Sequence, residues 1–167
     1  ALETRLATLE GAPCLSFPSG MGAYGGLLMA ALKQGDRVLT LSDGYYAARN
    51  LLTEILTPFG VTCETCPAAQ IENAVLDDFH MVIIETPSNP GLSVINIATM
   101  AEKCRQAGAL LVVDNTVCTP LLQNPLDLGA DAVIVSDTKA MGGHSDLLMG
   151  HVASHDSTLM DRVHSVR

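Results

Sequence analysis

Three short apolar runs constrain the fold of this chain more than any other feature of its sequence. They occupy residues 81–84, 110–113 and 132–135, and none alternates polar with apolar residues as a half-exposed strand does. Such runs are typical of strands buried on both faces of a sheet. Apolar residues at helical spacing in 45–59 and 97–107 place helices between strands. We therefore predict an α/β domain with a mostly parallel sheet flanked by helices.

The remaining segments fit the same alternation of helices and strands. The sequence shows no internal repeat, low-complexity tract or linker. Hydrophobic period and Gly terminators predict further helices at 2–9 (ending at Gly11) and 20–32, and strands at 14–17, 37–41 and 61–66.

Length and charge limit the functions open to the chain. Its 167 residues, 48% of them hydrophobic, are enough for one domain with a sizeable core. The net charge is −9 and the nine cations are scattered, which argues against a nucleic-acid partner. No stretch approaches the roughly 18 apolar residues of a spanning helix, and no signal-peptide core is present. We expect a soluble, cytoplasmic protein with no membrane partner.

The five cysteines include one suggestive pair, Cys63 and Cys66. Their spacing would suit a redox motif or half of a zinc site, given a helix start or a second pair. They lie instead in a strand-like segment, where residues three apart point to opposite faces. We expect structural cysteines and no metal site.

Polar residues follow each of the three apolar runs. They are ETPSNP at 85–90, DNT at 114–116 and SDTK at 136–139. Ligands in this fold class bind outside the carboxyl ends of the strands, so these groups are expected to face one crevice. The predicted strand 14–17 leads through Ser19 and Gly20 into a helix, whose free amides and dipole favour an anion such as phosphate.

Lys139 stands out among the three lysines of the chain. Lys33 and Lys103 have the surroundings of solvated side chains, whereas Lys139 follows a buried strand at the predicted crevice. A lysine there is suited to Schiff-base chemistry. Asp114 would be costly to bury without a partner, which a protonated pyridine nitrogen would supply. A lysine, an aspartate and a helix N-terminus that can bind phosphate together indicate pyridoxal 5′-phosphate (PLP).

Six sequence blocks then resemble one known family. They are ALETRLATLEG at 1–11, SGM at 19–21, ETPSNP at 85–90, VDNT at 113–116, PLDLGAD at 125–131, and SDTK at 136–139 followed by GHSD at 143–146. In order and spacing they are similar to the Cys/Met-metabolism (transsulfuration) enzymes, the cystathionine γ-lyase and γ-synthase group of fold-type I PLP enzymes. The resemblance covers essentially the whole chain.

The resemblance implies a role for individual residues. Lys139 would bind the cofactor covalently and move protons, Asp114 would pair with the ring nitrogen, and Tyr45 would stack on the ring and return protons. The implied cofactor-binding set is Gly20, Met21, Tyr45, Asn89, Asp114, Thr116, Ser136, Thr138 and Lys139, with the phosphate on Ser136, Thr138 and the amides of Gly20 and Met21, and Asn89 near the 3-oxygen.

Two departures from the family pattern stand beside these matches. Tyr46-Ala47-Ala48 replaces the usual Gly-Gly-Thr, which puts substrate-side contacts in doubt, and Asp137 replaces a residue that is usually small. His144 and Asp146 are expected to brace the lysine loop rather than to bind a metal.

The implied activity is that of a carbon–sulfur lyase of sulfur amino-acid metabolism, most simply γ-elimination from a cystathionine-like amino acid. Cystathionine γ-synthase, cystathionine β-lyase and O-acylhomoserine sulfhydrylase stay open as alternatives. The resemblance also implies a homo-oligomer, a dimer or tetramer. Relatives are longer, so residues 1–167 are expected to be the PLP-binding large domain without the N-terminal arm and C-terminal domain.

Two rival hypotheses remain at this point. Gly20, Gly22 and Gly25 satisfy the G-x-G-x-x-G fingerprint of NAD-binding dehydrogenases, with Asp43 as the acidic residue further on. Against it, that hypothesis leaves Lys139 and Asp114 unexplained. The other rival is a cofactor-binding fragment without turnover.

Overall fold

Seven strands form one mixed sheet in the computed structural model, which describes residues 1–167. From one edge to the other, the order is β1 (Cys14–Phe17), β7 (Gly150–Ala153), β6 (Ala132–Val135), β5 (Leu110–Asp114), β4 (Met81–Glu85), β2 (Arg37–Leu41) and β3 (Thr62–Cys66). The pairs among β6, β5, β4, β2 and β3 are parallel, and only β7 runs antiparallel to its neighbours. The predicted mostly parallel α/β sheet is confirmed.

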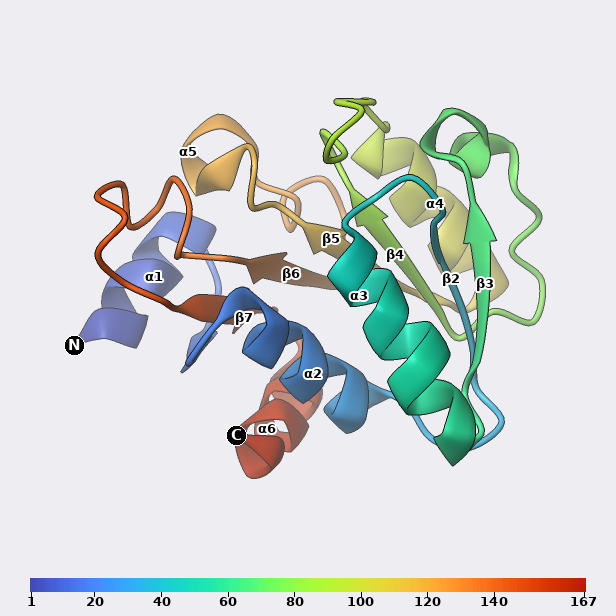
Figure 1. Cartoon of the computed structure of the whole chain (residues 1–167), viewed down its shortest axis with the longest axis horizontal. Coiled ribbons are helices and arrows are strands. Elements are labelled where there is room, and N and C mark those ends of the chain that lie inside the picture. The colour runs from blue at the N-terminus through green and yellow to red at the C-terminus, as the bar shows by residue number, and fades with distance from the viewer.

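Helices cover both faces of this sheet (Figure 1). On one face lie α2 (Gly20–Ala31), α3 (Tyr46–Asn50) and α6 (Ser157–Val166), and on the other lie α1 (Leu2–Glu10) and α4 (Ile97–Ala107). The shorter helical segments are the π-helix Leu51–Leu56, the 3-10 helices Thr57–Phe59 and Ala68–Asn73, and α5 (Thr119–Leu122). None of the helices is both long and apolar enough to cross a membrane.

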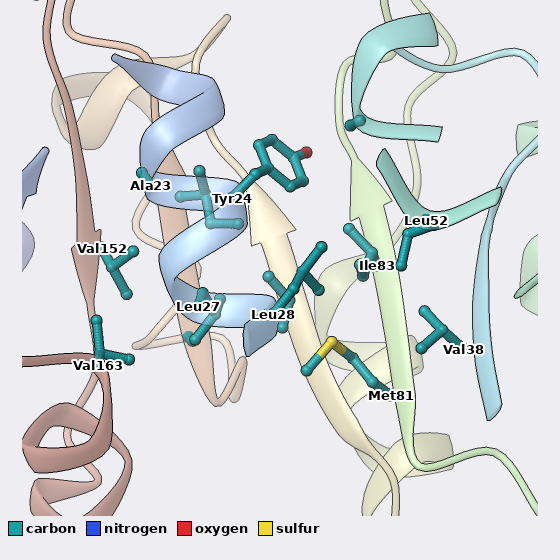
Figure 2. Packing of buried hydrophobic residues seen from close by; sticks show 14 of the residues in the cluster. Ala23, Tyr24, Leu27, Leu28, Val38, Leu52, Met81, Ile83, Val152 and Val163 are labelled. Atoms are coloured by element: carbon teal, nitrogen blue, oxygen red, sulfur yellow. The ribbon is translucent and has the colours of Figure 1, made fainter. Parts of the chain in front are cut away.

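The central strands are buried on both faces, as their apolar runs predict. Alternate residues of β4 divide between two cores, with Met81 and Ile83 under α2 and Val82 and Ile84 under α4. Figure 2 shows the first of these cores, in which Leu28 of α2 lies over the strands near Met81 and Ile83. Packing on both faces therefore holds the central strands in place next to the loops that follow their carboxyl ends.

Local sequence signals set where several elements begin and end. The Ser19 side chain caps α2 by accepting a hydrogen bond from the Gly22 amide at 2.9 Å. Gly26 lets α2 lie against β1, because a Cβ there would stand 2.4 Å from the Phe17 ring. Both α1 and α4 end at a left-handed glycine, Gly11 and Gly108, as the sequence predicts.

Three features differ from the sequence predictions. The predicted continuous helix 45–59 is instead α3 followed by a π-helix and a 3-10 turn. The strand β7 and the short helix α5 have no counterpart among the predicted elements. Lys103, expected to be solvated, donates from Nζ to the carbonyls of Glu72 at 2.7 Å and Ala74 at 2.8 Å. These two carbonyls lie at the end of the 3-10 helix 68–73, so Lys103 ties that segment to α4.

The Cys63 and Cys66 side chains lie on β3 and pack on different faces of the sheet. Cys63 contacts the core under α2, and Cys66 contacts the core under α4. This placement confirms the predicted strand and the opposite orientation of the two residues.

Candidate active site

A cavity of about 440 Å³ opens at the carboxyl ends of β4, β5 and β6, beside the N-terminus of α2. All nine residues predicted to bind a cofactor line it: Gly20, Met21, Tyr45, Asn89, Asp114, Thr116, Ser136, Thr138 and Lys139. The predicted convergence of the strand ends is therefore confirmed in space. Ser19, Tyr24 and Glu85 also line the cavity and were not among the predicted site residues.

One side of the cavity is formed by the first turn of α2. The amides of Gly20 and Met21 have no acceptor within the helix and carry the positive end of its dipole. Gly20 is packed so tightly against Ser136 that a Cβ would stand 2.7 Å from the Ser136 Cβ. The close approach brings the helix N-terminus and the Ser136 side chain together, as an anion site needs.

The segment after β6 is tied down by hydroxyl groups. The Ser136 amide donates to Oγ1 of Thr116 at 2.8 Å. The Thr138 hydroxyl donates to the Met149 carbonyl and accepts from the Met149 amide, both at 3.1 Å. Thr138 therefore lines the cavity as predicted, but its hydroxyl proton is engaged by Met149 rather than free for a phosphate.

Asp114 lies buried at the floor of the cavity, and both of its oxygens have partners. Oδ1 accepts from the Thr116 amide at 3.0 Å, and Oδ2 accepts from the Tyr24 hydroxyl at 2.8 Å. Burial raises the pKa of Asp114, and the hydrogen bonds from Thr116 and Tyr24 offset part of that rise. The carboxylate is thus fixed in orientation and aimed at the cavity.

Tyr24 is a residue of the cavity that the sequence pattern did not predict. It projects from α2 above Leu27 and Leu28 (Figure 2) and is 4% exposed. Burial, and then the nearby Asp114, raise the pKa of its hydroxyl well above the usual value, so it remains a donor. The available signal was a tyrosine in a helix of small and apolar residues, because a buried tyrosine hydroxyl needs a partner.

Glu85 is a second carboxyl at the same edge, beside Asp114 in the register of β4 and β5. Its Oε2 accepts from the Tyr45 amide at 2.9 Å, and it also accepts from the Asn89 amide. Burial and then the neighbouring Asp114 raise the pKa of Glu85 to about 7. Glu85 thereby joins the backbone at Tyr45 to the backbone at Asn89.

The side chains of Tyr45, Asn89 and Lys139 are the accessible ones. Tyr45 is 37% exposed, and its ring centroid lies 5.4 Å from that of Tyr46 in an edge arrangement. Asn89 and Lys139 are exposed at the cavity. Of the three lysines, Lys139 alone lines the cavity, since Lys33 is exposed elsewhere and Lys103 is bound by carbonyls.

His144 and Asp146 lie in the exposed turn after Lys139. Nδ1 of His144 is 3.0 Å from the Gly142 carbonyl, a contact within that turn. Asp146 does not line the cavity.

The sheet order excludes the dehydrogenase hypothesis. In a dinucleotide fold the fingerprint strand lies beside the strand that carries the acidic residue. Here β1 is at the sheet edge, with four strands between it and β2, and Asp43 after β2 accepts from the Ala68 amide at 2.8 Å. Two of the fingerprint glycines, Gly20 and Gly22, pack closely against Ser136 and Ser19, whereas a Cβ at Gly25 would meet nothing within 4 Å.

Comparison with known proteins decides the family. A family model described as "Cys/Met metabolism PLP-dependent enzyme" matches residues 1–167. The chain belongs to this family. It is 37% identical to the cystathionine gamma-lyase of Bacillus subtilis over 171 residues, covering 100% of the chain and 45% of that protein. It is 36% identical to the cystathionine beta-lyase MetC of the same organism, covering 100% of the chain and 44% of that protein.

A solved relative confirms the fold. The crystal structure of metB from Corynebacterium glutamicum superposes with a TM-score of 0.91 at 37% identity, covering 97% of this chain and 43% of that one. The chain thus spans less than half of the length of the relatives it matches.

The residues of the cavity fit the PLP that defines the family. The α2 amides and the Gly20–Ser136 contact form a cradle that a Cβ would fill. The buried Asp114 carboxylate suits a cationic ring nitrogen, and the one lysine of the cavity suits an aldehyde. The three groups that PLP requires therefore border one space of suitable size.

Proposed function

We propose that residues 1–167 are the PLP-binding large domain of a carbon–sulfur lyase that acts by γ-elimination on cystathionine-like amino acids. The observation that carries this proposal is the meeting of Lys139, Asp114 and the α2 N-terminus around one cavity. The resemblance to gamma-lyase and beta-lyase relatives supports the class of reaction. Their nearly equal identities do not separate γ- from β-elimination.

Each residue contributes by binding, orienting or moving a proton. PLP supplies the electron sink for the carbanion formed at the substrate α-carbon. In the proposal, the Lys139 amine binds the cofactor and, once displaced by substrate, takes the α-proton. Asp114, held by Thr116 and Tyr24, keeps the ring nitrogen protonated. The Gly20 and Met21 amides and Ser136 bind the phosphate.

The Tyr45 backbone amide is fixed by Glu85, while the ring stays accessible at the cavity mouth. In the proposal the ring stacks on the cofactor and its hydroxyl returns a proton near the leaving group. Asn89, whose amide is also held by Glu85, orients the cofactor 3-oxygen.

The decisive test is a Lys139→Ala substitution in the full-length protein. Wild-type protein with PLP is expected to develop the visible absorbance of lysine-bound cofactor and to release thiol and ketoacid from cystathionine. The variant is expected to lose both. A variant that keeps the visible band would overturn the assignment of Lys139. Formation of cystathionine and the free acyl acid from O-acylhomoserine plus cysteine, with no thiol or ketoacid released from cystathionine, would favour the synthase alternative.

We further propose that the full-length protein is a cytoplasmic homo-oligomer with no nucleic-acid partner. The net charge of −9 supports a small-molecule ligand over nucleic acid. Leu121 and Leu122 of α5 are 76% and 83% exposed, which supports burial against another surface. Light scattering of the purified protein tests the homo-oligomer, and cell fractionation tests the cytoplasmic location.

A further inference from the structure

Three ionisable side chains meet in the interior behind the cavity. Nδ1 of His151 on β7 lies 2.9 Å from Oδ1 of Asp137, and its Nε2 lies 3.0 Å from Oε1 of Glu10 at the end of α1. The three residues are 0%, 1% and 0% exposed respectively. We call this set, Glu10, His151 and Asp137, the buried triad. No step of the proposed reaction uses it.

The imidazole of the buried triad is charged. Both ring nitrogens face carboxylate oxygens, and only the doubly protonated ring donates on both sides. Burial alone lowers the pKa of His151, but the hydrogen bonds and charges of Asp137 and Glu10 raise it to about 9. The second oxygen of Glu10, Oε2, is buried without a partner. The buried triad therefore places one cationic ring between two carboxyl groups.

The buried triad is connected to the lysine segment by sequence. Asp137 stands between Ser136 and Thr138, two residues before Lys139. The backbone of Ser136 is tied to Thr116 and that of Thr138 to Met149, so the Asp137 side chain is the middle of three anchors. The Asp137 carbonyl also accepts from Gly142 at 2.7 Å, which closes the turn that contains Lys139.

The same strand contacts the phosphate side of the cavity. Gly150 precedes His151 on β7, and a Cβ at Gly150 would stand 2.7 Å from backbone atoms of Ser19 and Gly20. One end of β7 thus supports the N-terminus of α2 through Gly150 and the lysine segment through His151. A shift of His151 would therefore move both the N-terminus of α2 and the segment 136–139.

We propose that His151, held by Glu10, is a positioning residue that fixes Asp137 and thereby sets the geometry of residues 136–139 for PLP. This inference rests on the proposed cofactor site and gives a physical reason for an acidic residue at position 137, where the family pattern has a small one. A small residue there has nothing to offer an imidazolium, whereas Asp137 completes the pairing of both ring nitrogens.

The test compares His151→Gln, Asp137→Asn and the double variant in the full-length protein. The readouts are the dissociation constant of PLP, the visible spectrum of the bound cofactor and the melting temperature of the cofactor-free form. Each single variant is expected to weaken PLP binding at least tenfold and to change the visible band. The double variant is expected to lose little more than either single variant, because both remove the same anchor.

A Lys103→Met variant is the control for stability. Lys103 on α4 binds the carbonyls of Glu72 and Ala74 on the other face of the sheet, and it does not line the cavity. It is expected to lower the melting temperature and to leave PLP binding and the spectrum unchanged. A His151→Gln protein with a wild-type dissociation constant and spectrum, whatever its melting temperature, overturns the inference.

If His151→Gln does not fold, Glu10→Gln decides, since Gln keeps an acceptor for Nε2 and removes one charge. A several-fold weaker PLP affinity is expected for it, and an unchanged affinity overturns the inference. Failure of the proposed function has a different signature, because wild-type protein would then not acquire the visible band at all.

Discussion

The Tyr24 hydroxyl donates a 2.8 Å hydrogen bond to Oδ2 of Asp114, joining the helix α2, whose N-terminus lines the cavity, to the carboxylate at the cavity floor. This contact spans 90 residues of sequence and is buried. It leaves Asp114 one orientation, with Oδ1 on the Thr116 amide. The position of α2 and the direction of the carboxylate are therefore set together.

Tyr24→Phe is expected to lower kcat of the full-length enzyme about tenfold or more, with a smaller change in KM. A hydrogen bond to a charged group contributes about 1.5–3 kcal/mol, and the variant leaves a buried oxygen unpaired. Steady-state kinetics on cystathionine measure the effect. Tyr46→Phe, on an exposed tyrosine next to Tyr45, is the matched control. Equal kinetics for the two variants would remove Tyr24 from the site.

Gly20→Ala is expected to weaken PLP binding by a factor of ten or more. The added methyl group would stand 2.7 Å from Cβ and 2.9 Å from Oγ of Ser136, so the phosphate site has to open. Gly25→Ala on the same helix is the control, since a Cβ there meets nothing within 4 Å. That control is expected to gain up to about 1 kcal/mol of stability from helix propensity. Titration with PLP measures the affinity of each variant, and urea unfolding measures its stability. Equal PLP affinities for Gly20→Ala and Gly25→Ala would contradict a phosphate site at Gly20.

Glu85→Gln is expected to change how the stability of the cofactor-free protein depends on pH. The pKa of Glu85 rises to about 7 on folding, so the folded state binds its proton more tightly than the unfolded state. The wild type therefore loses up to about 3 kcal/mol as pH increases from 4.5 to 7. Gln accepts the same amides and has no such loss. Urea unfolding of both proteins from pH 4.5 to 8 tests this, and parallel pH profiles would refute it.

His151 is expected to cause a second loss of stability with rising pH, at higher pH than Glu85, because it loses a positive charge there. Its pKa of about 9 in the folded protein exceeds the unfolded value of 6.5, so its contribution is complete below pH 6.5 and is lost by about pH 9. The groups that face it are Glu10, Asp137 and, next to both, Cys14, whose pKa is raised to about 12 and which stays neutral. Urea unfolding should show a loss of about 3 kcal/mol in wild type that is absent from His151→Gln.

Much of the fold and site could be predicted because local chemistry matches the global arrangement. The runs of β4, β5 and β6 are too apolar for any place but the middle of a sheet, and their polar ends then meet by geometry. Asp114 follows such a run directly and Lys139 lies four residues after the end of another, and a charged side chain placed beside buried strands requires a partner or a function.

The residues that were missed depend on contacts distant in sequence. The strand β7 has a Gly and a His among its four residues, so it lacks the apolar run of its neighbours. The role of Tyr24 requires knowing that its hydroxyl reaches Asp114 at the end of β5, and the buried triad requires knowing that β7 lies between β1 and β6. Sheet order decides these pairings, and no local pattern encodes it.

The position of β7 also has a consequence for the order in which the molecule is made. β7 is the only sheet neighbour of β1, although 132 residues separate Phe17 from Gly150. During synthesis the N-terminal segment, with the Ser19 and Gly20 turn, has no strand to pair with until Gly150–Ala153 emerges. The turn at the start of α2 is thus made well before the strand that supports it, and this side of the cavity is completed only when β7 has been synthesised.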